Sequence, residues 1–348
     1  MVAKRLMRYG ALPMLAALLL SGCGGGSAPG GSVSAPSPAP TPTASATAEQ
    51  REASRSNFAV AANADSAYRM GVTGRGIKIA VLDTGIMPGL SEFAGRIDPA
   101  SADIGGSRGL GDVSGHGTAI TSIAAAARDG SAIHGIAFDA TILSFNVTDP
   151  ARCSGNDCPA QSGPVVRAID AAIASGARVI NMSFNVDQTA DDLTDAVRRA
   201  AAAGIVIVIS AGNESASQPL LLSRSFVEAG GGNVIIAGGV DSLGRRYRHG
   251  NQAGSGPAAM AYLNALGVDV NMIDRDGSVI VQSGTSASAP VISGAAALIA
   301  QARPNLTGRQ IVALLLDNAT DAGAAGPDAV FGRGILNIGA ALSASNGS

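Results

Sequence analysis

Residues 177–210 read ARVINMSFNVDQTADDLTDAVRRAAAAGIVIVIS, the clearest structural pattern in the chain. A mostly apolar run at 177–182 is followed by a helical pattern with a charged face at 191–203, and a continuous apolar run follows at 205–210. Strands that are apolar throughout are typical of sheets covered on both faces, and a helix between two such strands is typical of a parallel crossover. The stretch therefore predicts a strand–helix–strand unit of a parallel sheet.

The same alternation continues on both sides of this unit. Further strands are expected at 77–82, 141–147 and 234–237, and further helices at 116–127, 164–174, 286–302 and 307–318. We therefore predict an α/β fold, a three-layer, mostly parallel β-sheet with helices on both faces. In such sheets, ligands bind beyond the carboxyl ends of the strands.

Composition and charge exclude several classes of function. The 348 residues are 46% hydrophobic and 14% charged, which excludes a disordered chain. Aromatic residues make up only 3%, so the core is expected to consist mainly of Ala, Val, Ile and Leu. The net charge of −2 provides no basic face for phosphates, and we expect no nucleic-acid partner.

The first 22 residues have the pattern of an export signal. Three basic residues precede a short apolar run at 11–20, which is about half of what a transmembrane helix needs. The sequence LSGC at 20–23 resembles the bacterial lipobox, which implies cleavage before Cys23 and acylation of that cysteine. Ordinary signal cleavage that leaves an unmodified cysteine is the alternative.

Composition then divides the exported chain in two. Residues 23–48 are rich in Gly, Ser, Ala, Pro and Thr and are expected to form a tether, while the folded domain is expected at 49–348. An acylated Cys23 would make a membrane the partner of the N-terminus. Gly24 is not the acidic residue that often retains lipoproteins at the inner membrane, which predicts an outer-membrane location.

Two further cysteines, Cys153 and Cys158, lie close together in the turn-rich sequence CSGNDC. Outside the cytoplasm, such a pair is expected to form a local disulfide. Zinc is a poor alternative, because no His or third Cys lies nearby.

Only three histidines occur, and a general base that works near neutral pH is usually a histidine. His116 stands between two glycines at the start of an expected helix, which leaves its imidazole accessible. His134 and His249 each precede a glycine in an expected loop or turn and are weaker candidates. His116 is therefore the candidate base.

Three more candidates lie where an expected strand ends or an expected helix begins. Ser286 opens a helix, so backbone N–H groups and the helix dipole face any developing oxyanion. Asp83 ends a buried strand, where a fixed carboxylate can hold an imidazole in one tautomer. Asn213 follows the strand at 205–210, and its amide can donate to the oxyanion. Each motif alone is also typical of a turn, a loop or a helix cap, so their combination carries the argument.

Five motifs stand in a characteristic order, at 81–86 (VLDTGI), 115–118 (GHGT), 181–184 (NMSF), 210–213 (SAGN) and 284–290 (GTSASAP). Together they resemble the subtilisin-like serine proteases, the subtilase family, whose Asp, His, Ser order they share. The resemblance covers residues 70–341. The ending VFGRGILN at 330–337 looks most like the catalytic domains of autotransporter subtilases.

This resemblance implies an exported serine endopeptidase that works through an acyl-enzyme and acts on protein or peptide substrates. Asp83 would orient His116, and His116 would take the proton of Ser286. Asn213 would donate to the oxyanion. We expect a monomer.

The resemblance also implies the residues that bind substrate. In the family, the substrate adds as a strand beside two enzyme segments, and pockets provide the specificity. The matching residues are Phe145, Asn146, Met182, Ser183, Phe184, Asn185, Ala211 and Gly212, with Glu214 near the base of the first pocket. Asn185 and Val186 stand where most relatives have Gly, which predicts a narrowed pocket, and Glu214 would favour a basic residue.

No cofactor or metal is expected. Many subtilases bind calcium through acidic loops, but Asp98 and Asp103 share one loop without matching a dedicated calcium pattern.

Two other functions compete with this one. An α/β-hydrolase esterase needs a His after its Ser, and none follows Ser286. A catalytically silent surface binding protein on a subtilase scaffold is the second alternative, although the Asp, His, Ser and Asn candidates are all present.

Overall fold

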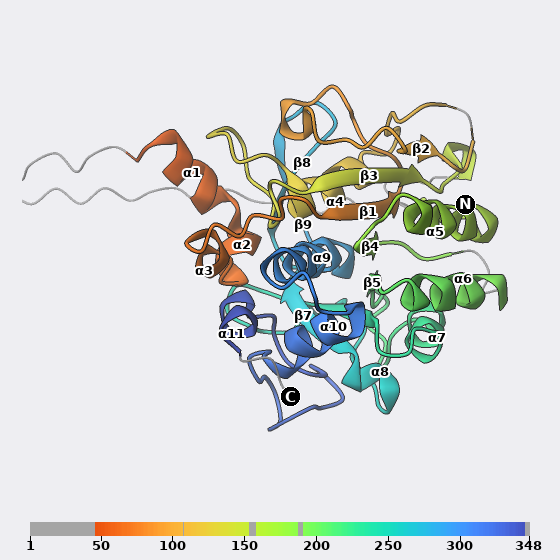
Figure 1. Cartoon of the computed structure of the whole chain (residues 1–348). Helices are drawn as coiled ribbons and strands as arrows, with labels where there is room; N and C mark the ends of the chain where they lie inside the picture. Colours follow the sequence, from red (N-terminus) through yellow and green to blue (C-terminus); the bar gives the residue numbers. More distant parts are fainter. Residues whose placement is uncertain (1–45, 107, 153–157, 187–190, 345–348) are drawn as a thin grey trace, which may run out of the picture. The chain divides into compact units, whose positions relative to one another are not determined.

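Seven parallel strands form the centre of the fold (Figure 1). The computed structural model describes residues 46–106, 108–152, 158–186 and 191–344. In this part of the chain the strand order is β2-β3-β1-β4-β5-β6-β7. The strands are β1 (Lys78–Asp83), β2 (Ala102–Asp103), β3 (Thr141–Asn146), β4 (Val179–Met182), β5 (Val206–Ser210), β6 (Val234–Val240) and β7 (Tyr262–Leu266). The predicted fold class is confirmed.

The strand order reverses between β1 and β4. The chain passes from β1 to β3 on one side, then crosses to β4 and continues outward to β7. Ligands in open parallel sheets usually bind at such a reversal, beyond the carboxyl ends of the strands. Asp83 pairs with Asn146 at the carboxyl ends of β1 and β3, and Leu82 pairs with Met182 of β4. The segments that follow these strands therefore meet at one edge of the sheet.

Helices cover both faces of the sheet. One face carries α4 (His116–Ala125), α9 (Thr285–Ala302) and α10 (Gly308–Asp317), and the other carries α5 (Ser162–Ala174), α6 (Asp191–Ala202) and α7 (Leu221–Ala229). Strand side chains alternate between the two core clusters, with Ile79 and Val81 in the first and Ala80 and Leu82 in the second. Because both faces are buried, these strands are apolar along most of their length.

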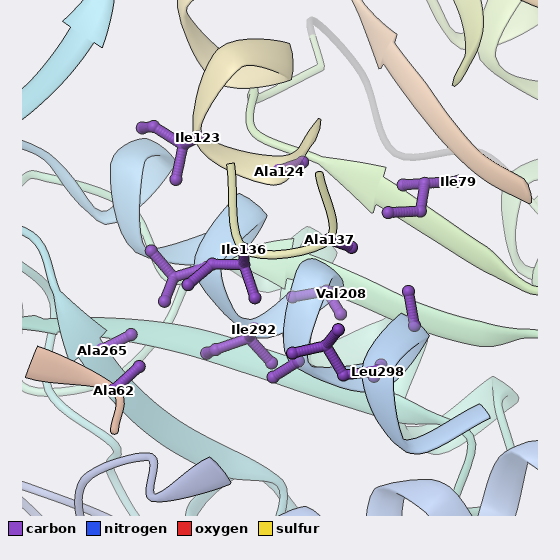
Figure 2. Close-up of a cluster of buried hydrophobic side chains, with 14 of the residues drawn as sticks. Ala62, Ile79, Ile123, Ala124, Ile136, Ala137, Val208, Ala265, Ile292 and Leu298 are labelled. Atoms are coloured by element: carbon purple, nitrogen blue, oxygen red, sulfur yellow. The ribbon is translucent and has the colours of Figure 1, made fainter. Parts of the chain in front are cut away.

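Helix α9 crosses the centre of one face. It packs against α4 and against β4, β5, β6 and β7, and its residues from Ala287 to Ala300 are buried. Figure 2 shows Ile292 and Leu298 of this helix in the same cluster as Ile123 of α4 and Val208 of β5. Among the described residues, no helix combines the length and the apolar character that crossing a membrane requires.

Several elements have no counterpart among the sequence predictions. Besides β2, α7 and β7, they are α1 (Ala48–Arg55), α2 (Asn57–Ala61), α3 (Asp65–Tyr68), α8 (Pro257–Met260), α11 (Ile338–Ser343), the 3₁₀ turns η1 (Ser91–Phe93) and η2 (Pro150–Arg152), and an antiparallel hairpin of β8 (Val270–Ile273) and β9 (Val279–Gln282). The hairpin ends just before α9 begins.

Candidate active site

Four candidate residues line one cleft at the carboxyl edge of the sheet. Asp83 is the last residue of β1, His116 is the first of α4, and Ser286 is the second of α9. Asn213 lies in the loop that follows β5. All four line a cleft of about 760 Å³. The topology thus brings together side chains from four distant parts of the sequence.

The carboxylate of Asp83 fixes the imidazole of His116. Nδ1 of His116 donates to Oδ1 of Asp83 at 2.8 Å, and the backbone N–H of Thr84 donates to the same oxygen at 2.8 Å. Asp83 is 2% exposed, whereas the imidazole is 20% exposed. Because the buried carboxylate is an acceptor, Nδ1 carries the proton, and Nε2 of the neutral ring is free to accept one.

Two carboxylates act on the pKa of His116. Burial of the ring lowers this pKa, but the charge and hydrogen bond of Asp83 and the charge of Asp112 raise it, and the net shift is upward from 6.5. The two carboxylates thus stabilise the imidazolium relative to that of a free histidine, which suits a group that must take up a proton during a reaction.

Ser286 is held at the first turn of α9. The hydroxyl of Ser183 donates to the backbone oxygen of Ser286 at 2.9 Å. A Cβ atom placed on Gly284 would lie 2.9 Å from Oγ of Ser286 and 3.7 Å from Nδ2 of Asn213. The serine hydroxyl and the asparagine amide therefore adjoin the same small space beside the helix start.

Hydrogen bonds orient the amide of Asn213. Its Oδ1 accepts from the backbone N–H of Thr285 at 2.9 Å and from the Thr285 hydroxyl at 3.1 Å. Because Oδ1 is engaged by the start of α9, Nδ2 is the group that remains to donate near Ser286. An amide donor beside the N-terminus of a long helix suits a developing negative charge.

Residues 74–334 match the model of the subtilase family (Peptidase_S8). The chain belongs to the subtilase family. It is 29% identical to subtilisin DY from Bacillus licheniformis over 280 residues, which cover 80% of this chain and 95% of that protein. An extracellular serine protease from Serratia marcescens is 28% identical over 365 residues, which cover 80% of this chain and 32% of that protein. Among solved structures, the MycP3 protease from the type VII (ESX-3) secretion system is similar, with a TM-score of 0.66 and 25% identity, covering 82% of this chain and 88% of that one.

The cleft of this subtilase contains part of the predicted substrate-binding set, namely Ser183, Phe184, Asn185, Gly212 and Glu214. Four others are buried and do not line it: Phe145, Asn146, Met182 and Ala211. The reason is clearest for Phe145 and Asn146, because β3 is paired with β1 on one edge and with β2 on the other. Its backbone therefore has no free edge for a substrate strand.

Other lining residues were not predicted from the sequence: Thr84, Thr148, Cys158, Pro159, Leu220 and Gln282. Thr84 lies within the VLDTGI motif, directly after Asp83, and Gln282 lies two residues before the GTSASAP motif. Proximity to a motif was the available signal for these two residues. The others come from segments without a motif, which only the tertiary fold brings to the cleft.

A buried amide holds Glu214 in the cleft. Nδ2 of Asn251 donates to Oε2 of Glu214 at 2.7 Å, and the backbone N–H of Glu214 donates to Oδ1 of Asn251 at 3.1 Å. Asn251 itself is 2% exposed. The residues that line the described cleft include the carboxylates of Asp83 and Glu214 but no Lys or Arg. This charge balance suits a cationic group on the substrate.

Of the three cysteines with a predicted modification in this subtilase, only Cys158 lies in the described part of the chain. Cys158 lines the cleft. Cys153 and Cys23 lie outside the described residues, so the pairing and the acylation stay predictions.

The acidic loop considered for calcium is neutralised by basic side chains. Asp98 pairs with Nζ of Lys78 at 2.8 Å, and Asp103 pairs with Nε of Arg108 at 2.8 Å. The described residues contain no cluster of three His, Cys, Asp or Glu that is suited to a metal ion. The expectation that no metal is required stays a prediction.

His134 is buried rather than exposed in a turn. It is 2% exposed, and its ring packs against Tyr68 and Phe138. Burial lowers the pKa of His134 to about 4. Its ring is therefore a neutral part of the core, and it does not line the cleft.

Proposed function

We propose that this subtilase is an exported serine endopeptidase that hydrolyses peptide bonds through an acyl-enzyme. The observation that carries the proposal is the 2.8 Å hydrogen bond between His116 and Asp83 at a cleft that also contains Ser286. A nucleophile, a base and a group that orients the base are what this chemistry needs.

The proposed reaction gives one role to each of these residues. Nε2 of His116 takes the proton of the Ser286 hydroxyl while Oγ of Ser286 attacks the carbonyl carbon of the scissile peptide. The oxyanion accepts hydrogen bonds from Nδ2 of Asn213 and from the backbone N–H of Ser286. The tetrahedral intermediate collapses, and the imidazolium returns its proton to the leaving amine. A water molecule, deprotonated by the same imidazole, then hydrolyses the acyl-enzyme.

The first pocket favours Lys or Arg before the scissile bond. Glu214 is held in place by Asn251, and its carboxylate is not balanced by a basic side chain among the described lining residues. Asn185 and Val186 also line the cleft and occupy space that glycines would leave open. A long, thin side chain with a terminal charge therefore fits this pocket better than a large aromatic ring.

A fluorophosphonate probe tests the proposed chemistry, because it reacts with a serine that a base and oxyanion donors have activated. The exported chain is expected to be labelled, and Ser286→Ala is expected not to be. Ser283→Ala is the matched control, since Ser283 is exposed and only three residues away, and this variant should label like wild type. A folded wild-type protein that takes no label would contradict the proposal and favour a silent binding scaffold.

The exported protein is anchored to a membrane by lipid on Cys23 and remains monomeric. The basic and apolar N-terminus with its LSGC sequence supports this, and the extracellular relative from Serratia marcescens agrees with export. Cells grown with a fatty-acid analogue should label the wild-type protein but not Cys23→Ser. Exported wild-type protein without lipid would contradict the anchor, and its recovery in the inner membrane would contradict an outer-membrane location.

A further inference from the structure

Asp112 lies in the loop before α4 and accepts four hydrogen bonds, although its carboxylate has no role in the reaction steps above. Its Oδ1 accepts from the Thr84 hydroxyl at 2.8 Å and from the backbone N–H of Gly115 at 2.7 Å. Its Oδ2 accepts from the backbone N–H and from the hydroxyl of Thr118, both at 2.8 Å. Asp112 is 3% exposed, so these donors replace the water that its carboxylate would otherwise bind.

The donors come from the two elements that carry Asp83 and His116. Thr84 directly follows Asp83, and Gly115 directly precedes His116. The Thr84 hydroxyl also accepts from the backbone N–H of Gly117 at 2.8 Å. The neighbours on both sides of His116 are thus tied to Asp112, either directly or through Thr84.

Side-chain packing cannot set the distance between β1 and α4 at this point. A Cβ atom on Gly117 would lie only 2.2 Å from the backbone oxygen of Gly85, so the two backbones are already in close contact. A polar link between the backbones can hold the two segments at this separation. Asp112 and Thr84 provide this link.

Helix capping alone does not explain the arrangement. The N-cap of α4 is Gly115, which has no side chain to accept from the first N–H groups, and Oδ2 of Asp112 accepts from Thr118 in its place. One carboxylate oxygen is enough for that purpose. The second oxygen reaches Thr84, beyond the end of a different element.

We infer that Asp112 is a positioning residue of the proposed reaction, which fixes the start of α4 against the end of β1 and so holds His116 at its distance from Asp83. The inference rests on the proposed function. The Asp112 charge also faces His116 and contributes to the upward shift of its pKa. The imidazolium that forms during the attack is therefore stabilised by two carboxylates.

Asp112→Asn tests the bonds and the charge together. An amide offers one acceptor oxygen in place of two, so the hydrogen bond from the backbone N–H of Gly115 or the one from the backbone N–H of Thr118 is lost. We expect kcat to fall roughly 10- to 100-fold, with KM changed by less than about twofold. The acid limb of kcat/KM should move to lower pH, because a negative charge that faces His116 is gone.

The other charges around His116 are unchanged in this variant. The Asp83 carboxylate stays in place. Asp274 and Arg275, which lie against Gly115 from the hairpin of β8 and β9, carry opposite charges. Asp274→Asn is therefore the matched control, because it removes a nearby carboxylate that does not bond to α4, and it should leave kcat unchanged.

Variants of Thr84 separate the bonds from the charge. Thr84→Val removes the hydroxyl that joins Asp112 to Gly117 but keeps the carboxylate. We expect kcat to fall while the acid limb stays in place. Thr84→Ser keeps the hydroxyl and should restore kcat.

The titration of His116, followed by NMR, gives a readout that needs no activity. A lower His116 pKa in Asp112→Asn supports the contribution of the Asp112 charge even if wild-type protein fails to react with the fluorophosphonate and the proposed function falls. A folded Asp112→Asn protein with wild-type kcat, acid limb and His116 titration overturns it. If Asp112→Asn does not fold, wild-type kcat in Thr84→Val overturns it instead.

Discussion

His116 must lose its proton to act as a base, and its surroundings oppose that loss. Burial lowers the pKa of the ring, but the Asp83 and Asp112 carboxylates raise it above 6.5 overall. Since the neutral ring is the active form, kcat/KM with a peptide substrate should rise with pH through a value above 6.5. Asp83→Asn should move this limb to lower pH and reduce kcat by roughly 10⁴-fold. A wild-type limb below 6.5 would contradict the geometry.

At the same scale, Glu214 is expected to set the charge preference of the first pocket. Glu214→Gln keeps the shape and the contact with Asn251 but removes the negative charge. The ratio of kcat/KM for matched peptides with Lys or Met before the scissile bond should fall roughly 5- to 50-fold, as expected when a partly exposed charge pair is lost. Asp241→Asn, outside the cleft, is the control. An unchanged ratio in Glu214→Gln would assign the preference to other residues.

At the scale of elements, the stability of the region where α1, η1 and the loop after α4 meet should depend on pH. Glu52 of α1 accepts hydrogen bonds from the backbone N–H groups of Asp129 and Gly130 at 3.0 and 3.1 Å. Glu92 of η1 is 3% exposed, and its Oε2 has no partner among the described residues. Burial, with the charges of Asp129 and Glu52, raises the pKa of Glu92 to about 7.

The direction in which stability changes with pH follows from this raised pKa of Glu92. Because the folded state favours protonated Glu92, its contribution to stability is complete below 4.5 and is lost as pH rises through about 7. The free energy of unfolding should therefore be higher in Glu92→Gln than in wild type at pH 8, by roughly 1–3 kcal/mol, and the difference should shrink toward pH 5. Urea unfolding at the two pH values measures it. A constant difference would mean that Glu92 does not titrate in this range.

The elements also show which sequence patterns are informative. β1 and β5 were predicted because both of their faces are buried, which gives continuous apolar runs, and the run of β4 is interrupted only by Asn181. β7 was not predicted: its run YLNAL contains the buried Asn264, whose Nδ2 donates to the backbone oxygens of Phe331 and Gly334, while its Oδ1 has no partner among the described residues. Those partners lie far away in the sequence, so no local pattern reveals that the asparagine is compatible with this strand at the edge of the sheet.

At the scale of the whole molecule, the residues of the cleft also divide into those with a local sequence signal and those that depend on distant partners. Asp83, His116, Asn213 and Ser286 were predictable because each lies beside a strand end or a helix start. Asp112 was not singled out, because a single Asp in a loop has no local signature, and its role depends on how β1 meets α4. The walls of the cleft likewise depend on which loops the complete sheet brings together.

The position of Ser286 depends on close packing along the whole of α9. A Cβ atom on Gly294 would lie 2.5 Å from Cβ of Ile136, which is fully buried, so Gly294→Ala must displace the helix or the loop before β3. We expect a loss of roughly 1–3 kcal/mol in the free energy of unfolding. Slower fluorophosphonate labelling should accompany it, because the displaced helix carries Ser286. Gly163→Ala in α5 is the control, since only Nη1 of Arg167, at 3.5 Å, adjoins the added atom there. Equal losses of unfolding free energy and of labelling rate in both variants would mean that the contact of α9 with Ile136 is not what holds Ser286 in place.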